Sequence, residues 1–332
     1  HSSNPLSRRL VTRLTRSQPG VLLVEREAPP RVIVCPPPTR TNSWEDVSDL
    51  SRSFGLVLDG WQELILQSSL GERSNGTWAA KRVSFSVPRQ NGKSQLLVAR
   101  ALAGVLLFGE KKIVISAHQQ DTARETFQKF LELIDESPAL AARVSQIMNA
   151  LNREFIKFTN GAIIQFKARS SGGTRGFSCD CLMLDEAQIL SRRAWASINS
   201  TMSARKNPQV WLLGTPPQPE DDSDVFGSVR RSALDGKSTT AAYLEWSASP
   251  EDDPEDEATR AKANPAWFIR INHEVVQGEY ETYTPDQFAI ERLGIWPDDM
   301  RGAGVISAAD WSARLDPASA IVGDPVLVLD VS

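Results

Sequence analysis

Residues 83–108 constrain the fold of this chain more than any other segment. They begin with an alternation of apolar and polar residues over Val83–Val87, which predicts a β-strand. A short loop then ends in Gly92, Lys93 and Ser94, and the run that follows is almost entirely apolar, which predicts a buried helix. A strand, a tight loop and a helix that begins at Gly-Lys-Ser form the context of a phosphate-binding loop.

The N-terminus of that helix has the chemistry to bind a nucleotide. Its unpaired backbone N–H groups and partial positive charge hold anions. Lys93 would reach the β- and γ-phosphates, and the Ser94 hydroxyl would ligate Mg²⁺. The first glycine of the usual motif is replaced by Val87. An ordinary loop before a helix therefore stays open as the alternative for this segment alone.

Two carboxylates follow a second apolar strand. Residues 181–184 predict a buried strand, and Asp185 and Glu186 come directly after it. Ligands bind at the carboxyl ends of strands in α/β sheets. Asp185 would join the Mg²⁺ shell beside Ser94, and Glu186 would act as the base that polarises the attacking water. The alternative is a strand that ends in two surface acids.

Two further polar residues are candidates for contacts with the nucleotide. Gln62 lies in a predicted short helix about 30 residues before Lys93, and an amide offers the donor and acceptor that an adenine edge requires. A surface Gln beside a core Trp61 is the alternative. Thr215 follows a predicted strand at 209–213 and would touch the γ-phosphate region, although Gly-Thr-Pro alone is only a turn.

Composition limits the class of protein. The chain has 332 residues, which suggests two domains or one large α/β domain with additions. With 41% hydrophobic and 23% charged residues, its composition is that of a soluble globular protein. No apolar run is long enough to span a bilayer. The net charge of −4 argues against a chain that is basic throughout, so any DNA contact would use local patches. The three cysteines and three histidines argue against a disulfide framework or a zinc site.

The order of predicted elements indicates an α/β fold with a mostly parallel central sheet flanked by helices. We expect an N-terminal arm at 1–43, a phosphate-loop core at 44–216 and a smaller lid and linker subdomain at 217–315. Within the core, Asn160-Gly161 predicts the turn of a hairpin. Residues 316–332 read as the first strand of another domain, so we expect the sequence to be a fragment.

Four segments together resemble the ATPase portion of large terminase subunits, the DNA-packaging motors of tailed bacteriophages. The resemblance extends over roughly residues 55–332. The family's phosphate loop lacks the first glycine and carries a basic residue before Gly-Lys-Ser, a place that Arg89 occupies here. The four segments are Val87–Ser94, Leu184–Gln188, Leu213–Pro216 and Phe288–Trp296.

The resemblance implies an ASCE-type P-loop NTPase with a lid that matches about 217–310. It implies that ATP and Mg²⁺ drive double-stranded DNA into a procapsid, in the host cytoplasm and transiently on the portal. The implied partners are the DNA, the portal protein, the small terminase subunit and further copies of the chain in a ring, usually of five. No membrane is involved.

Residue by residue, the resemblance implies one nucleotide site. Glu186 would be the catalytic base, and Lys93 would also act in catalysis. Arg175, 11 residues before Glu186, matches the place of an arginine finger that acts on a neighbour's ATP, with Arg169 and Arg89 as other candidates. The residues implied to bind nucleotide or Mg²⁺ are Gln62, Arg89, Gln90, Asn91, Gly92, Lys93, Ser94, Asp185 and Thr215.

The resemblance also implies an RNase H-like nuclease domain after the ATPase, with Asp330 as its first metal-binding carboxylate. The remaining acids are absent from the sequence, and a two-metal nuclease needs several carboxylates, so we expect no DNA cleavage.

Three other functions remain open. A helicase-like, nucleic-acid-dependent ATPase would need a second motor domain, for which 217–332 is small and acidic. A non-motor P-loop NTPase is the second alternative, although a GTPase would carry an Asn-Lys-x-Asp motif that this chain lacks. A structural protein that only retains a nucleotide fold is the third, and the presence of Lys93, Asp185 and Glu186 argues against it.

Overall fold

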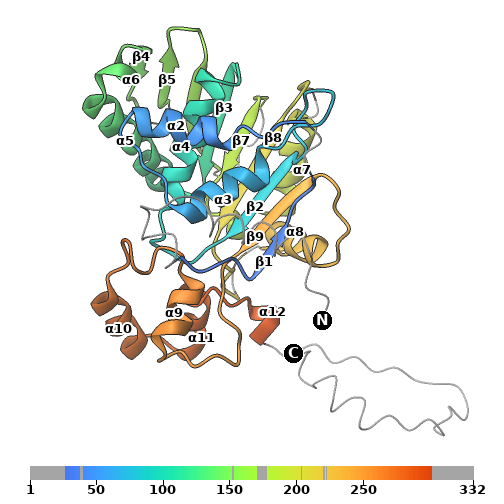
Figure 1. Cartoon of the computed structure of the whole chain (residues 1–332), viewed down its shortest axis with the longest axis vertical. Coiled ribbons are helices and arrows are strands. Elements are labelled where there is room, and N and C mark those ends of the chain that lie inside the picture. The colour runs from blue at the N-terminus through green and yellow to red at the C-terminus, as the bar shows by residue number, and fades with distance from the viewer. Residues whose placement is uncertain are drawn as a thin grey trace, which may run out of the picture.

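The chain forms one nine-stranded sheet with helices on both faces and a small helical lobe at one end (Figure 1). The strand order is β1-β9-β2-β8-β7-β3-β6-β5-β4. This arrangement confirms the predicted α/β fold with a mostly parallel sheet flanked by helices. The computed structural model describes residues 27–37, 40–151, 153–169, 178–202, 204–219, 221 and 223–300.

The middle of the sheet is parallel. All pairs from β9 through β2, β8, β7 and β3 to β6 run in the same direction. Both faces of such a sheet are covered, which explains why its strands are near-continuous apolar runs. These six strands are β2 (Arg82–Ser86), β3 (Lys112–Ala117), β6 (Ile163–Ala168), β7 (Cys181–Leu184), β8 (Gln209–Gly214) and β9 (Ala241–Glu245).

Antiparallel strands flank this middle part at both edges. At one edge, β5 (Phe155–Phe158) and β6 form the predicted hairpin, and Gly161 in its turn has a φ of 82°. Asn-Gly favours turns in which the glycine has a positive φ. Next to β5, β4 (Val144–Met148) is the last strand of that edge. At the other edge, β1 (Val32–Val34) pairs with β9.

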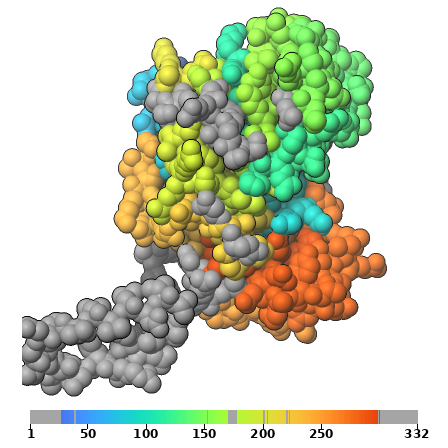
Figure 2. Space-filling model, turned by 180° about the vertical axis from the view of Figure 1, so that it is seen from behind, coloured from blue at the N-terminus to red at the C-terminus, as the bar shows by residue number. Residues whose placement is uncertain are grey.

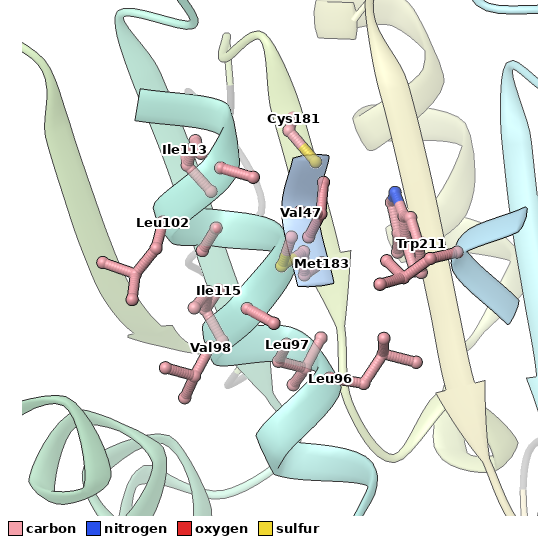
Figure 3. Close-up of a cluster of buried hydrophobic side chains, with 14 of the residues drawn as sticks. Val47, Leu96, Leu97, Val98, Leu102, Ile113, Ile115, Cys181, Met183 and Trp211 are labelled. Carbon is pink, nitrogen blue, oxygen red and sulfur yellow. The ribbon is translucent and has the colours of Figure 1, made fainter. Parts of the chain in front are cut away.

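Two hydrophobic clusters attach the helices to the two faces of the sheet. Alternate residues of β7 point to opposite clusters, since Met183 packs with α4 (Lys93–Leu106) and Leu184 packs with α8 (Asp224–Leu234). Figure 3 shows the first cluster, in which Leu97 and Leu102 of α4 lie over the strands. The other helices of the sheet domain are α2 (Trp44–Ser53), α3 (Gly60–Ser69), α5 (Gln120–Glu136), α6 (Pro138–Ala141), the 3-10 turn η2 (Ala187–Ile189) and α7 (Arg192–Met202).

The sheet extends beyond the boundaries expected at 43 and 216. β1 comes from the expected arm and β9 from the expected lid, yet both pair within the sheet. All five residues of β9 are buried there. β9 pairs with β2, which lies far away in the sequence, so the local pattern did not reveal this pairing.

A third, separate apolar cluster marks the lid. It runs from Ala248 to Ile295 and includes Trp267, Phe288 and Leu293. We use the name lid for residues 248–296, most of which surround this cluster, and Figure 2 shows them in orange as a lobe beside the sheet domain. Its helices are α9 (Glu257–Ala263), α10 (His273–Thr282) and α11 (Pro285–Glu291), and α12 (Pro297–Met300) follows.

Several predicted features lie outside the described residues. These are Arg175, Asp330, most of the expected arm and the expected strand at 316–332. Among the helices that the structure describes, none has the length and apolar character needed to cross a membrane.

Candidate functional site

The candidate site lies where the parallel strands β2, β8, β7 and β3 end. β2 leads into the predicted phosphate loop at 87–92, and β7 leads into Asp185 and Glu186. Because β8 lies between β2 and β7, the loop and the acids are only two strands apart. The fold therefore brings together the two motifs that the sequence separates by about 90 residues.

The backbone of the phosphate loop is held in an unusual conformation. Gly92 is the N-cap of α4 and has a φ of 99°, a region that glycine adopts readily. A Cβ atom at this position would also come within 2.1 Å of an Arg270 nitrogen. Gln90 has a φ of 65° without being glycine, a strained conformation typical of functional loops.

Lys93 is held at the mouth of the loop. Its Nζ donates hydrogen bonds to the carbonyls of Val87 at 2.8 Å and Pro88 at 3.0 Å. Burial lowers the pKa of Lys93 to about 8, and the Asp185 carboxylate opposes that shift. A bound anion would favour the charged form of this amine. Ser94 follows as the second residue of α4 and is half-buried.

Asp185 is a buried carboxylate with a fixed orientation. Its side chain is 8% exposed, and its Oδ1 accepts a hydrogen bond from the Glu186 N–H at 2.9 Å. Its backbone N–H donates to the Ser116 carbonyl at the end of β3. Burial raises the pKa of Asp185, whereas Lys93 opposes the shift. A cation beside this carboxylate would therefore be favourable.

Glu186 has a left-handed backbone, with φ 54° and ψ 46°. Its carboxylate accepts hydrogen bonds from the His118 backbone N–H at 3.0 Å and from the Thr122 hydroxyl at 3.4 Å. The predicted base thus lies between the end of β7 and the start of α5. Non-glycine residues in this conformation carry backbone strain and cluster at functional sites.

Thr215 connects the two loops through a residue that the sequence did not single out. The Thr215 N–H donates to Gln188 Oε1 at 3.4 Å, and Gln188 belongs to the turn that carries the acids. In the other direction, the Val87 N–H donates to the Gly214 carbonyl at 3.1 Å. The end of β8 therefore contacts both the phosphate loop and the acidic turn.

Gln62 is buried completely and supports the phosphate loop. Its Nε2 donates to the Gly92 carbonyl at 2.9 Å, and its Oε1 accepts from the Asp59 N–H at 2.8 Å. A further bond reaches Gln95. The amide already has partners within the chain, so the structure gives Gln62 a bracing position, and its contact with adenine stays a prediction.

The lid holds the phosphate loop from the other side. Asn91 is fully buried, its Nδ2 donates to Asn264 Oδ1 at 2.9 Å, and its Oδ1 accepts from the Ala266 N–H at 3.0 Å. Arg270 donates to the Asn91 carbonyl at 2.7 Å and to Asp59 at 2.8 Å. No local pattern in the sequence indicated these lid residues.

The two preceding loop residues also contact the lid. Arg89 forms an ion pair with Glu291 at 2.5 Å, although the Arg89 side chain is 63% exposed. Gln90 accepts a hydrogen bond from Arg292 at 3.2 Å, and Arg292 in turn pairs with Glu279. Residues 89–92 therefore all lie against the lid.

Replacing Arg270 by Ala tests this link. We expect nucleotide affinity to fall about tenfold, because the Asn91 carbonyl and the Asp59 carboxylate lose a charge-assisted donor. Fluorescent ATP-analogue titration measures the change. Lys262→Ala is the matched control, since Lys262 forms an ion pair with Asp252 within the lid and away from the loop. An unchanged affinity in Arg270→Ala would show that the lid contact does not shape the loop.

Glu27 caps α3 next to this site and has a strongly shifted pKa. Its Oε1 accepts from the Gly60 N–H at 3.0 Å, and burial raises its pKa from 4.5 to about 7. Between pH 4.5 and about 7, the folded chain holds a proton at Glu27 that the unfolded chain has lost. The free energy of unfolding therefore decreases as the pH rises through this range.

Glu27→Gln, which mimics the protonated acid, should remove this pH dependence. We expect the variant to be more stable than the parent by about 1–2 kcal/mol at pH ~8 and equal to it near pH ~5. Urea unfolding at the two pH values measures the difference. Glu45→Gln replaces an exposed acid of α2 and serves as control. A Glu27→Gln variant with no gain at the higher pH contradicts the assignment.

Comparison with known proteins was made for the sequence and for the fold. Residues 60–225, which are 166 of the 332, match the family model described as terminase large subunit, ATPase domain. No curated protein matches the sequence.

Two solved structures illustrate the similarity of the fold. The large terminase of bacteriophage HK97 is 19% identical, with a TM-score of 0.67 over 77% of this chain and 56% of that chain. A variant of the large terminase ATPase domain of Thermus phage P74-26 is also 19% identical, with a TM-score of 0.51 over 75% of this chain and 98% of that one. The chain thus spans about 56% of the length of the HK97 protein.

Proposed function

The chain belongs to the family of terminase large-subunit ATPase domains, and on this basis we propose that it hydrolyses ATP to move double-stranded viral DNA into a procapsid. The family match confirms the resemblance seen in the sequence. One observation carries the proposal of hydrolysis: the phosphate loop and the Asp185-Glu186 turn meet at the ends of parallel strands. The same chain thus supplies groups for the phosphates, the metal and the attacking water.

The residues present fit ATP with Mg²⁺. The α4 N-terminus offers backbone N–H groups, and the amine of Lys93 is one that an anion would keep charged. When bound, Mg²⁺ would supply positive charge that neutralises the phosphates. Oxygen ligands are what Mg²⁺ prefers, and the Ser94 hydroxyl and the buried Asp185 carboxylate would hold it, directly or through water.

We propose Glu186 as the base for the attacking water. It directly follows Asp185, the proposed metal ligand, and its backbone has a left-handed conformation. A change in the conformation of this turn would reach Thr215 through Gln188, because a hydrogen bond joins these two residues. Arg175 remains our proposal for the arginine finger acting on a neighbouring subunit.

The partners are proposed at the level of the whole motor: double-stranded DNA, the portal protein, the small terminase subunit and other copies in a ring, in the host cytoplasm and on the portal.

The lid is an unfavourable surface for DNA, because residues 248–296 contain eleven acids and four basic residues. We expect the DNA contacts on the sheet domain.

ATP turnover tests the proposal, with Lys93→Ala as the blank. We expect a rate above the blank that rises with double-stranded DNA and with protein concentration, because a neighbouring subunit completes the site. A rate that does not change with concentration would exclude a contribution from a neighbour. A rate equal to the blank, with and without DNA, would overturn the proposed hydrolysis.

A further inference from the structure

Arg169 is a buried arginine at the carboxyl end of the sheet. It directly follows β6, its backbone N–H donates to the Ala117 carbonyl at 2.9 Å, and the residue is only 6% exposed. Its guanidinium donates to the Ser116 carbonyl at 2.7 Å, to the Asp185 carbonyl at 2.6 Å and to the Glu186 carbonyl at 3.0 Å. One side chain therefore joins the ends of β3 and β7 directly behind the two carboxylates.

We propose that Arg169 is a positioning residue for hydrolysis, which holds the backbone of Asp185 and Glu186 so that both carboxylates face their reaction partners. It would act within its own subunit. The inference rests on the proposed ATP hydrolysis and adds a residue to that site.

The conformation of Glu186 supplies the first argument. A left-handed backbone at a non-glycine residue persists only where the surrounding structure holds it. The Glu186 N–H is held by Asp185 Oδ1, and its carbonyl accepts from both Arg169 and the Ile189 N–H. Arg169 also donates to the carbonyl of the preceding residue, Asp185. Removing the guanidinium would take this donor from the Asp185 carbonyl and leave the Glu186 carbonyl with its bond from the Ile189 N–H.

The burial of the charge supplies the second argument. Arg169 carries its charge in a buried position, since only 6% of the residue is exposed. The hydrogen bonds of the guanidinium nevertheless go to backbone carbonyls, and its Nε has no partner within the described part of the chain. A buried charge without a bonded carboxylate is unfavourable for stability, which indicates that the site retains it for another reason.

The geometry separates Arg169 from the candidate arginine fingers. Its donors are directed at carbonyls of its own strands, so it cannot also reach the phosphates of a neighbour's nucleotide. Arg89 is exposed, and Arg175 lies outside the described residues, so both stay candidates for that role.

Arg169→Ala and Arg169→Lys test the positioning role. We expect Arg169→Ala to lower kcat about 100-fold while nucleotide affinity stays within about threefold, because misplaced catalytic groups affect the reaction step more than binding. Free guanidinium at a non-denaturing concentration should restore part of the rate in Arg169→Ala. Arg169→Lys, whose ammonium lacks the planar fork, should recover less than the parent rate. A normal kcat in folded Arg169→Ala would overturn the proposal.

Hydrogen exchange provides a readout that does not depend on ATP turnover. In Arg169→Ala the amides of Glu186 and Ile189 should exchange at least about tenfold faster, while the amides of α4 keep their protection. Unchanged exchange at both amides would overturn the proposal even if turnover falls. If the parent protein itself shows no turnover above Lys93→Ala, hydrolysis fails, yet the exchange result still decides whether Arg169 holds the turn.

Mixing of variants distinguishes action within a subunit from action on a neighbour. Arg169→Ala mixed with Glu186→Gln should stay inactive if Arg169 serves its own site. Restored turnover would mean that the Glu186→Gln subunit lends its Arg169 to a neighbour, and would overturn the proposal. Arg175→Ala mixed with Glu186→Gln is the reference, since restored turnover is expected for a finger that acts between subunits.

Discussion

Glu186→Gln is expected to bind ATP with near-normal affinity and to lose hydrolysis by about 10²–10⁴-fold. The amide keeps the shape of the side chain and its hydrogen-bond acceptor toward the His118 N–H, but it cannot take a proton from water. The substitution leaves the proposed phosphate loop unchanged. Fluorescent-analogue titration and steady-state phosphate release measure the two quantities on the same preparation.

An exposed acid on α5 offers a matched control for that variant. Glu125→Gln removes the same charge close to the site without a role in it, and its turnover should equal that of the parent. If Glu186→Gln retained turnover within about tenfold of the parent, Glu186 would not be the base.

Arg100→Leu is expected to lower the free energy of unfolding by about 3–5 kcal/mol, the range for removal of one partner of a buried ion pair. Arg100 is fully buried in α4 and pairs with Glu110 at 2.7 Å and 2.9 Å. It also donates to Gln209 Oε1 at 2.9 Å. The variant leaves the Glu110 carboxylate buried without a counter-charge. Urea unfolding measures the loss.

A double variant shows whether the lost stability comes from the unpaired charge. Arg100→Met combined with Glu110→Met replaces both charges with apolar groups, and we expect it to be more stable than Arg100→Met alone. Gln209 would retain its bonds to the Ser69 and Ala80 carbonyls. A double variant as unstable as the sum of the two single variants would contradict this reading of the pair.

The local motifs were predictable because short-range physics determines them. The helix begins at Lys93 as expected, since Gly92 provides the left-handed N-cap. The strand at 181–184 and the Asn160-Gly161 hairpin agree with their patterns for the same reason. Alternation, caps and turns depend on neighbours in sequence, so one sequence suffices to locate them.

The long-range parts of the site could not be predicted in this way. Asn91 contacts Asn264, 173 residues later, and Arg270 contacts the loop across 179 residues. The pairing of β9 with the sheet is also a long-range contact, because its partner strand β2 lies more than a hundred residues earlier. The position of Arg169 behind the acids also appears only when β6, β3 and β7 lie side by side.

The family assignment and the general fold are established, whereas the roles of individual residues are predictions. Lys93 follows β2, and Asp185 and Glu186 follow β7, with β8 between these two strands. Their roles in the reaction stay predictions. Arg175 and Asp330 lie outside the described residues, and their proposed roles rest on the resemblance.

A structure determined with Mg²⁺ and a non-hydrolysable ATP analogue would test the central claim most directly. We predict the β- and γ-phosphates at the N-terminus of α4, with Lys93 turned toward them and Mg²⁺ between Ser94 and Asp185. A nucleotide bound elsewhere, or no nucleotide bound at saturating concentration, would contradict the proposed site.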